Sequence, residues 1–94
     1  MERATLINDK ENQQFRVSLG GDYFAVAKYS LQGNVMTIYS TRVPDELQGK
    51  GYGKVMMEAI LPEIEKQGFK VIPTCSYVAH YLNRNNQWQH LLLE

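Results

Sequence analysis

The feature that most constrains this chain is a change in its hydrophobic period near the middle. Up to about residue 42 apolar side chains tend to alternate with polar ones, as Phe15, Val17 and Leu19 alternate with Arg16 and Ser18. This is the period of half-buried strands. From Gly51 onward the apolar side chains recur three and four residues apart, which is the spacing of a buried helical face. With 94 residues the chain has room for one domain. We therefore predict a single α+β domain over residues 1–94.

Three strands are predicted in the first half, joined by short glycine turns. Gly20-Gly21-Asp22 and Gln32-Gly33-Asn34 are turn sequences, and connections this short imply an antiparallel meander. A weaker strand is possible around Ala4 to Ile7. The three strands are expected at residues 15–19, 23–31 and 35–42.

The second half predicts helices around one further strand. The first helix runs from Gly51 to a C′ residue at Gly68, with a kink or break expected at Pro62. Lys70 to Ile72 is a strand that a right-handed crossover would place parallel to residues 35–42. Thr74 is expected to cap a helix from Cys75 to about Arg84, and a last short helix is expected around Trp88, Leu91 and Leu92.

The segment between the third strand and the long helix predicts an anion site. Gly49, Gly51 and Gly53 would each cost helix stability, yet they let the backbone approach a ligand closely. No Ser, Thr, Asp or Asn stands just before Gly49, so the first helical N–H groups lack an obvious cap. A phosphate group would satisfy them, and Lys50 and Lys54 would add positive charge. The alternative is that the glycines only shape a tight turn.

The segment Gln48-x-x-Gly51-x-Gly53 resembles the coenzyme A loop of the GCN5-related N-acetyltransferase (GNAT) superfamily. Together with Thr41-Arg42-Val43-Pro44 and the Cys75 that follows the next strand, it resembles the small single-domain members. The resemblance implies a minimal GNAT-like fold with acetyl-CoA as co-substrate and no metal. It implies that Thr41, Arg42 and Val43 align the pantetheine arm. The pyrophosphate would be held by Gln48, Gly49, Lys50, Gly51, Tyr52, Gly53 and Lys54. Ser40 departs from the pattern, because such proteins often carry His there.

Two residues are candidates for catalysis. Cys75 opens a predicted helix, where a thiolate is stabilised, so it can serve as a nucleophile that carries the acetyl group. The alternative is a small buried apolar side chain. Tyr81 stands where the resemblance places a tyrosine that protonates the leaving thiolate, although packing on the sheet is the competing interpretation.

The charge balance of the chain argues against two classes of binding partner. Ten basic and ten acidic residues give a net charge of +0, which disfavours nucleic-acid binding and docking on anionic membranes. One cysteine and an N-terminus without a signal peptide favour the cytoplasm. We expect a monomer or weak homodimer that transfers acetyl to an unidentified small-molecule or peptide acceptor. Two alternatives stay open: a module that binds CoA without turnover, and a scaffold whose glycine loop binds no nucleotide.

Overall fold

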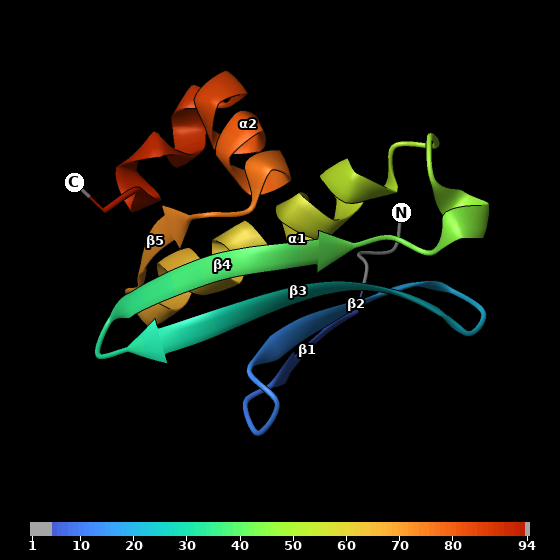
Figure 1. The fold of residues 1–94 in the computed structure, drawn as a ribbon, viewed down its shortest axis with the longest axis horizontal. Helices are drawn as coiled ribbons and strands as arrows, with labels where there is room; N and C mark the ends of the chain where they lie inside the picture. Colours follow the sequence, from blue (N-terminus) through green and yellow to red (C-terminus); the bar gives the residue numbers. More distant parts are fainter. Residues whose placement is uncertain (1–4, 94) are drawn as a thin grey trace.

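The computed structural model describes residues 5–93, which form one five-stranded sheet with helices against it (Figure 1). The strands lie side by side in chain order, from β1 at one edge to β5 at the other. The elements are β1 (Leu6–Asp9), β2 (Gln14–Gly20), β3 (Tyr23–Gln32), β4 (Val35–Arg42), a 3-10 turn η1 (Asp45–Leu47), α1 (Tyr52–Gln67), β5 (Lys70–Pro73), α2 (Ser76–Arg84) and a 3-10 helix η2 (Asn86–Leu91).

The predicted α+β class and strand order are confirmed. β2, β3 and β4 form the antiparallel meander, and β5 pairs with β4 in parallel. The weak N-terminal strand is present as β1, which pairs antiparallel with β2. Its expected start at Ala4 lies outside the described residues. The sheet therefore has four antiparallel strands before the parallel addition.

The core lies between α1 and one face of the sheet. Alternate residues of the strands, such as Phe15, Val17 and Ile38, are buried there against the apolar face of α1. The buried positions of α1 are Met56, Met57, Ile60, Leu61 and Ile64, at the three- and four-residue spacing that the sequence indicates. Figure 1 shows α1 crossing one side of the sheet, with α2 and η2 beyond the β5 edge.

Two local predictions about the helices are wrong: the break at Pro62 and the cap at Thr74. α1 continues through Pro62 without a break, because the helix is anchored on both sides of this exposed residue by buried Leu61 and Ile64. Thr74 does not cap α2: its Oγ1 donates to the Ile38 carbonyl at 3.2 Å, and Cys75 is the N-cap residue, without a side-chain cap bond. The prediction of Gly68 as the residue that ends α1 is confirmed by its φ of 77°.

Strands β4 and β5 stop pairing at one point along their length, and the candidate site lies at the end of β4 beyond that point. Their pairing ends at Ile38 and Pro73, and the Ile38 carbonyl accepts the amides of Thr74 and Cys75 at 3.1 and 3.0 Å. A bulge between Lys28 and Tyr29 shifts the β3–β4 register beside it. Beyond Ile38 the chain after β5 turns into α2, while β4 continues to Arg42. The last residues of β4 thus have no β5 residue beside them.

Candidate coenzyme A site

The loop before α1 is held in shape by its own side chains. Gln48 donates its Nε2 to the Val43 carbonyl at 3.1 Å and to Asp45 Oδ1 at 3.3 Å. The Leu47 amide donates to the Pro44 carbonyl at 2.9 Å. Gly49 and Gly51 have φ angles of 80° and 83°, a conformation that residues with a Cβ rarely adopt. Gln48 therefore braces the loop, and the two glycines let the chain reverse into the helix.

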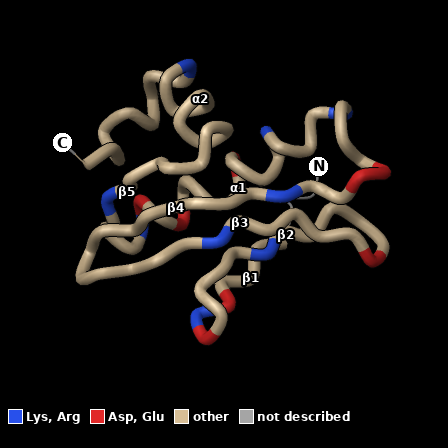
Figure 2. Tube along the Cα trace, in the orientation of Figure 1, with Lys and Arg blue, Asp and Glu red and all other residues tan. Residues whose placement is uncertain are grey.

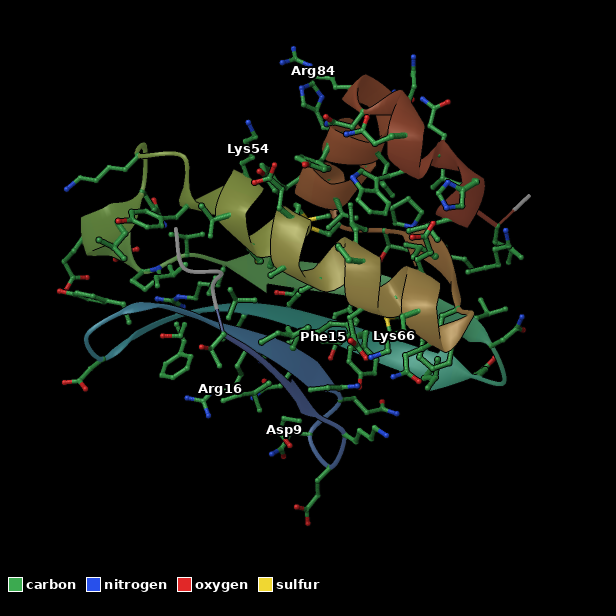
Figure 3. All side chains as sticks on the ribbon, turned by 180° about the vertical axis from the view of Figure 1, so that it is seen from behind. Asp9, Phe15, Arg16, Lys54, Lys66 and Arg84 are labelled. Atoms are coloured by element: carbon green, nitrogen blue, oxygen red, sulfur yellow. The ribbon has the colours of Figure 1, made fainter. Side chains whose placement is uncertain are left out.

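The start of α1 presents free peptide N–H groups. Gly51 is the N-cap and provides no side-chain cap. Within the part of the chain that the structure describes, none of the N–H groups of residues 49–54 donates to a protein oxygen. The dipole of α1 adds partial positive charge at this end. Lys54 projects outward from the first turns of α1 (Figure 3), and Figure 2 shows basic positions both in the loop and near the helix start. The combination suits a negatively charged group.

A cleft of about 310 Å³ opens beside these amides. It is bounded by the loop, the first turn of α1 and one residue of α2. Seven of the residues predicted to bind the cofactor line it: Val43, Gln48, Gly49, Gly51, Tyr52, Gly53 and Lys54, together with Leu47 and Tyr77. Lys50, although in the same loop, is exposed and lies outside the lining.

Two lining residues, Leu47 and Tyr77, were not predicted from the sequence, and Tyr77 comes from a different helix. A Cβ built on Gly53 would lie 2.6 Å from the Tyr77 hydroxyl oxygen and 2.8 Å from its Cζ. Gly53 has no positive φ, so this contact, and not backbone conformation, is what a side chain at position 53 would disturb: the Tyr77 ring would have to shift. A tyrosine two residues into a helix gives no local signal of such a contact, because it depends on how α2 packs beside α1.

Thr41 and Arg42 lie beyond the point where β4 and β5 separate. They pair with β3, opposite Ala27 and Val26, and no β5 residue pairs with them. Arg42 is exposed, whereas Thr41 is half-buried and faces α2. The open side of this strand end leads from the cleft toward Cys75. An extended chain with amide groups can hydrogen-bond such an edge as an added strand would.

The structure brings Thr41 and Cys75 together. Thr41 Oγ1 and Cys75 Sγ are 3.3 Å apart, and the thiol is half-buried at the start of α2. Burial acts to raise the pKa of this thiol, but the Thr41 hydroxyl and the nearby backbone N–H groups at the start of α2, which favour the thiolate, outweigh it. The pKa of Cys75 therefore lies below its ordinary value. A lowered pKa favours the thiolate form, as it does for other cysteines at helix N-termini.

Tyr81 lies one turn along α2 from Tyr77 and is separated from the cleft lining. The two rings are tilted against each other, with centroids 6.4 Å apart, and Tyr81 packs against the core. Burial raises the pKa of Tyr81, and the nearby Glu58 adds to this, so the phenol keeps its proton. Neither Tyr81 nor Cys75 lines the cleft. Cys75 thus lies against the predicted binding residue Thr41, whereas Tyr81 lies beside Tyr77 and outside the lining.

Among residues 5–93, no three His, Cys, Asp or Glu side chains are grouped as a metal ion would require. No helix in the described range has the length and apolar character needed to cross a bilayer.

The fold and this loop define the class of the protein. Residues 14–91 match the family model described as GCN5-related N-acetyl-transferase, and the chain belongs to that family. The match includes β2 to β5, the glycine loop and both helices.

Individual relatives agree with this assignment. The chain is 31% identical over 86 residues to Protein NATD1 of Mus musculus, covering 89% of this chain and 78% of that protein. Protein NATD1 of Homo sapiens is likewise 31% identical over 86 residues, with 76% of its length covered. In structure, the chain is similar to a GCN5-like protein of Staphylococcus aureus solved by NMR. The TM-score is 0.71 at 25% identity, and the match covers 99% of this chain and 91% of that one.

Proposed function

We propose that the protein binds acetyl-CoA in the cleft at the start of α1 and transfers its acetyl group to a small acceptor. The observation that carries this proposal is the set of free N–H groups over residues 49–54, which face a cleft lined by glycines. A diphosphate offers the acceptor oxygens that these donors lack, and family membership supplies the ligand. The residues in contact with the diphosphate would be Gly49, Lys50, Gly51, Tyr52, Gly53 and Lys54, with Gln48 bracing their loop.

The pantetheine arm would run along the open edge of β4. Thr41, Arg42 and Val43 lie between the cleft and Cys75, and their backbone can pair with the amides of the arm. This path would bring the thioester toward the Thr41–Cys75 pair. Fixing thioester and nucleophile together can account for several kcal/mol of the barrier.

Two routes of transfer fit the geometry. In the first, the Cys75 thiolate attacks the thioester carbonyl, a new C–S bond forms and the CoA thiolate leaves. The acceptor nucleophile then attacks the acetyl-cysteine and regenerates the thiolate. In the second, the acceptor attacks the thioester directly and the C–S bond to CoA breaks. Tyr81 gives its proton to the leaving CoA thiolate, and the proton lost by the acceptor restores the Tyr81 phenol. The first route uses Cys75 and the second uses Tyr81, and neither route needs a metal. A reducing cytoplasm suits the first route, because the thiol must stay unoxidised.

Two measurements test the proposal. Acetyl-CoA should raise the melting temperature of the protein, and no stabilisation at millimolar ligand would contradict CoA binding. Intact mass after incubation with acetyl-CoA should show the mass of one added acetyl group. The adduct should disappear in Cys75→Ala and persist in Ser76→Ala, the matched control one residue along. An adduct that persists in Cys75→Ala would exclude the acetyl-cysteine route.

A binding module without turnover is the second candidate. It is favoured by the position of Cys75 and Tyr81 outside the cleft lining and by the small size of the chain. It predicts stabilisation by CoA with neither an adduct nor CoA release when amines are added. In both candidates the cleft lining comes from one chain, so a monomer or weak homodimer is sufficient.

A further inference from the structure

The close approach of Tyr77 to Gly53 has a consequence for the ligand. The two residues come from different helices, and their contact brings a phenol hydroxyl to the backbone of the glycine loop. The hydroxyl oxygen lies 2.6 Å from the position that a Cβ of residue 53 would occupy. The N–H of residue 53 is one of the free donors at the start of α1.

Tyr77 is also available to a ligand. It lines the cleft, and 39% of its surface is exposed, so the ring forms a wall that solvent reaches. Burial raises the pKa of Tyr77, which keeps the phenol protonated and able to donate a hydrogen bond. The rest of the residue is fixed by α2, whose Val78 is buried in the core, and by the ring of Tyr81.

We propose that Tyr77 is a ligand-binding residue of the cleft, whose hydroxyl donates a hydrogen bond to the diphosphate held at the start of α1. The absence of a Cβ at Gly53 lets this hydroxyl lie against the backbone there. The inference rests on the proposed function, since the diphosphate is that of CoA. The Tyr77 hydroxyl would be a side-chain donor from α2 in a site whose other donors are backbone N–H groups. Bound CoA would then contact both α1 and α2.

The test is the affinity for CoA, measured by calorimetry on the whole chain. Tyr77→Phe keeps the ring and removes the hydroxyl, so CoA should bind about tenfold more weakly, as expected for a hydrogen bond to a charged group. Inorganic pyrophosphate, used as a competitor of CoA, should lose affinity by a similar factor. Tyr39→Phe is the matched control, because Tyr39 is an exposed tyrosine of β4 outside the cleft lining, and its affinity should equal that of the unmodified chain.

A second variant pair tests the steric part. Gly53→Ala should weaken CoA binding in the unmodified chain, because the new Cβ displaces Tyr77, and should cost nothing further in a Tyr77→Ala background. Equal losses in both backgrounds, or a Tyr77→Phe affinity within twofold of the unmodified chain, would overturn the inference. Absence of CoA binding by the unmodified chain would instead overturn the proposed function itself.

Discussion

At the scale of single residues, the Thr41–Cys75 pair is the contact with the clearest chemical consequence. The hydroxyl of Thr41 can donate to the thiolate form of Cys75, which is one reason why the pKa of the thiol lies below its ordinary value. Thr41→Val removes that donor and nearly conserves the volume, so the pKa of Cys75 should rise. Alkylation of Cys75 by iodoacetamide should then need a higher pH to reach half its maximal rate.

The matched control for this prediction is Thr37→Val on the same strand. Thr37 lies two positions before the bulge and pairs with Ile72, and it is not among the groups that hydrogen-bond to the thiol or shift its pKa. Its alkylation profile should coincide with that of the unmodified chain. A Thr41→Val profile that also coincides would mean that the helix amides alone set the reactivity of Cys75.

At the scale of elements, the glycine turn into α1 couples backbone conformation to ligand binding. Gly51 is at a φ of 83°, where a Cβ is strained by about 1–2 kcal/mol. Gly51→Ala should lower the free energy of unfolding by about that amount and should also weaken CoA binding, because the free amides move. Denaturant unfolding and calorimetry check the two effects.

Gly33 supplies the control for Gly51. It stands in the β3–β4 turn at a φ of 61°, with open space where its Cβ would be, and it is far from the cleft in the chain and absent from its lining. Gly33→Ala should cost similar stability and leave CoA affinity unchanged. If Gly51→Ala also left the affinity unchanged, the loop would not be the binding element.

Substitution of Pro62 should raise the free energy of unfolding, whereas the glycine substitutions lower it. It lacks an N–H for the carbonyl four residues earlier in α1, yet the helix continues through it, so the fold bears this cost. Pro62 is exposed, so Pro62→Ala restores the backbone bond without disturbing the core. The free energy of unfolding should rise by about 1–3 kcal/mol in a denaturant titration. An unchanged or lower stability would mean that Pro62 relieves strain elsewhere.

The same helix shows what a sequence pattern can and cannot give. The buried face of α1 is predicted by the spacing of Met56, Ile60 and Ile64, because a helix places residues three and four apart on one side. The sequence also contains the glycines and the missing cap that predict the anion site. Two features depend instead on tertiary contacts. The helix continues through Pro62 because Leu61 and Ile64 are packed in the core. The Thr74 hydroxyl, predicted to cap α2, donates to the Ile38 carbonyl instead.

Tyr77 illustrates the same limit at the site. Position 53 looked like a backbone requirement, since glycine recurs in the loop, but its φ is ordinary and the close contact there is with a residue of another helix. Such a contact has a sequence separation of more than twenty residues and no periodic signal. Local pattern therefore predicts the position of the proposed site better than it predicts which side chains surround it.

At the scale of the whole molecule, three tyrosines with raised pKa values should make the free energy of unfolding fall as the pH becomes alkaline. Tyr29 lies in the core, packs against Phe15 with ring centroids 5.1 Å apart, and donates its hydroxyl to Asn8 Oδ1 at 2.7 Å, which links β3 to the edge strand β1. Burial raises the pKa of Tyr29 above its ordinary value of 10.0, as burial does for Tyr77 and Tyr81. The unfolded chain therefore loses these protons at lower pH than the folded chain does.

The sign of the pH effect follows from this difference. Above about pH 10 the unfolded state binds fewer protons than the folded state, so the free energy of unfolding falls as pH rises toward the folded pKa values. Tyr29→Phe removes one of these groups together with its hydrogen bond to Asn8. At pH 8 it should lower stability by about 1 kcal/mol, and between pH 9 and about 11 its decline should be shallower than that of the unmodified chain. Urea titrations across that range measure both quantities, with Tyr39→Phe as the exposed control. A parallel decline in Tyr29→Phe and the unmodified chain would show that ionisation of Tyr29 contributes nothing to alkaline unfolding.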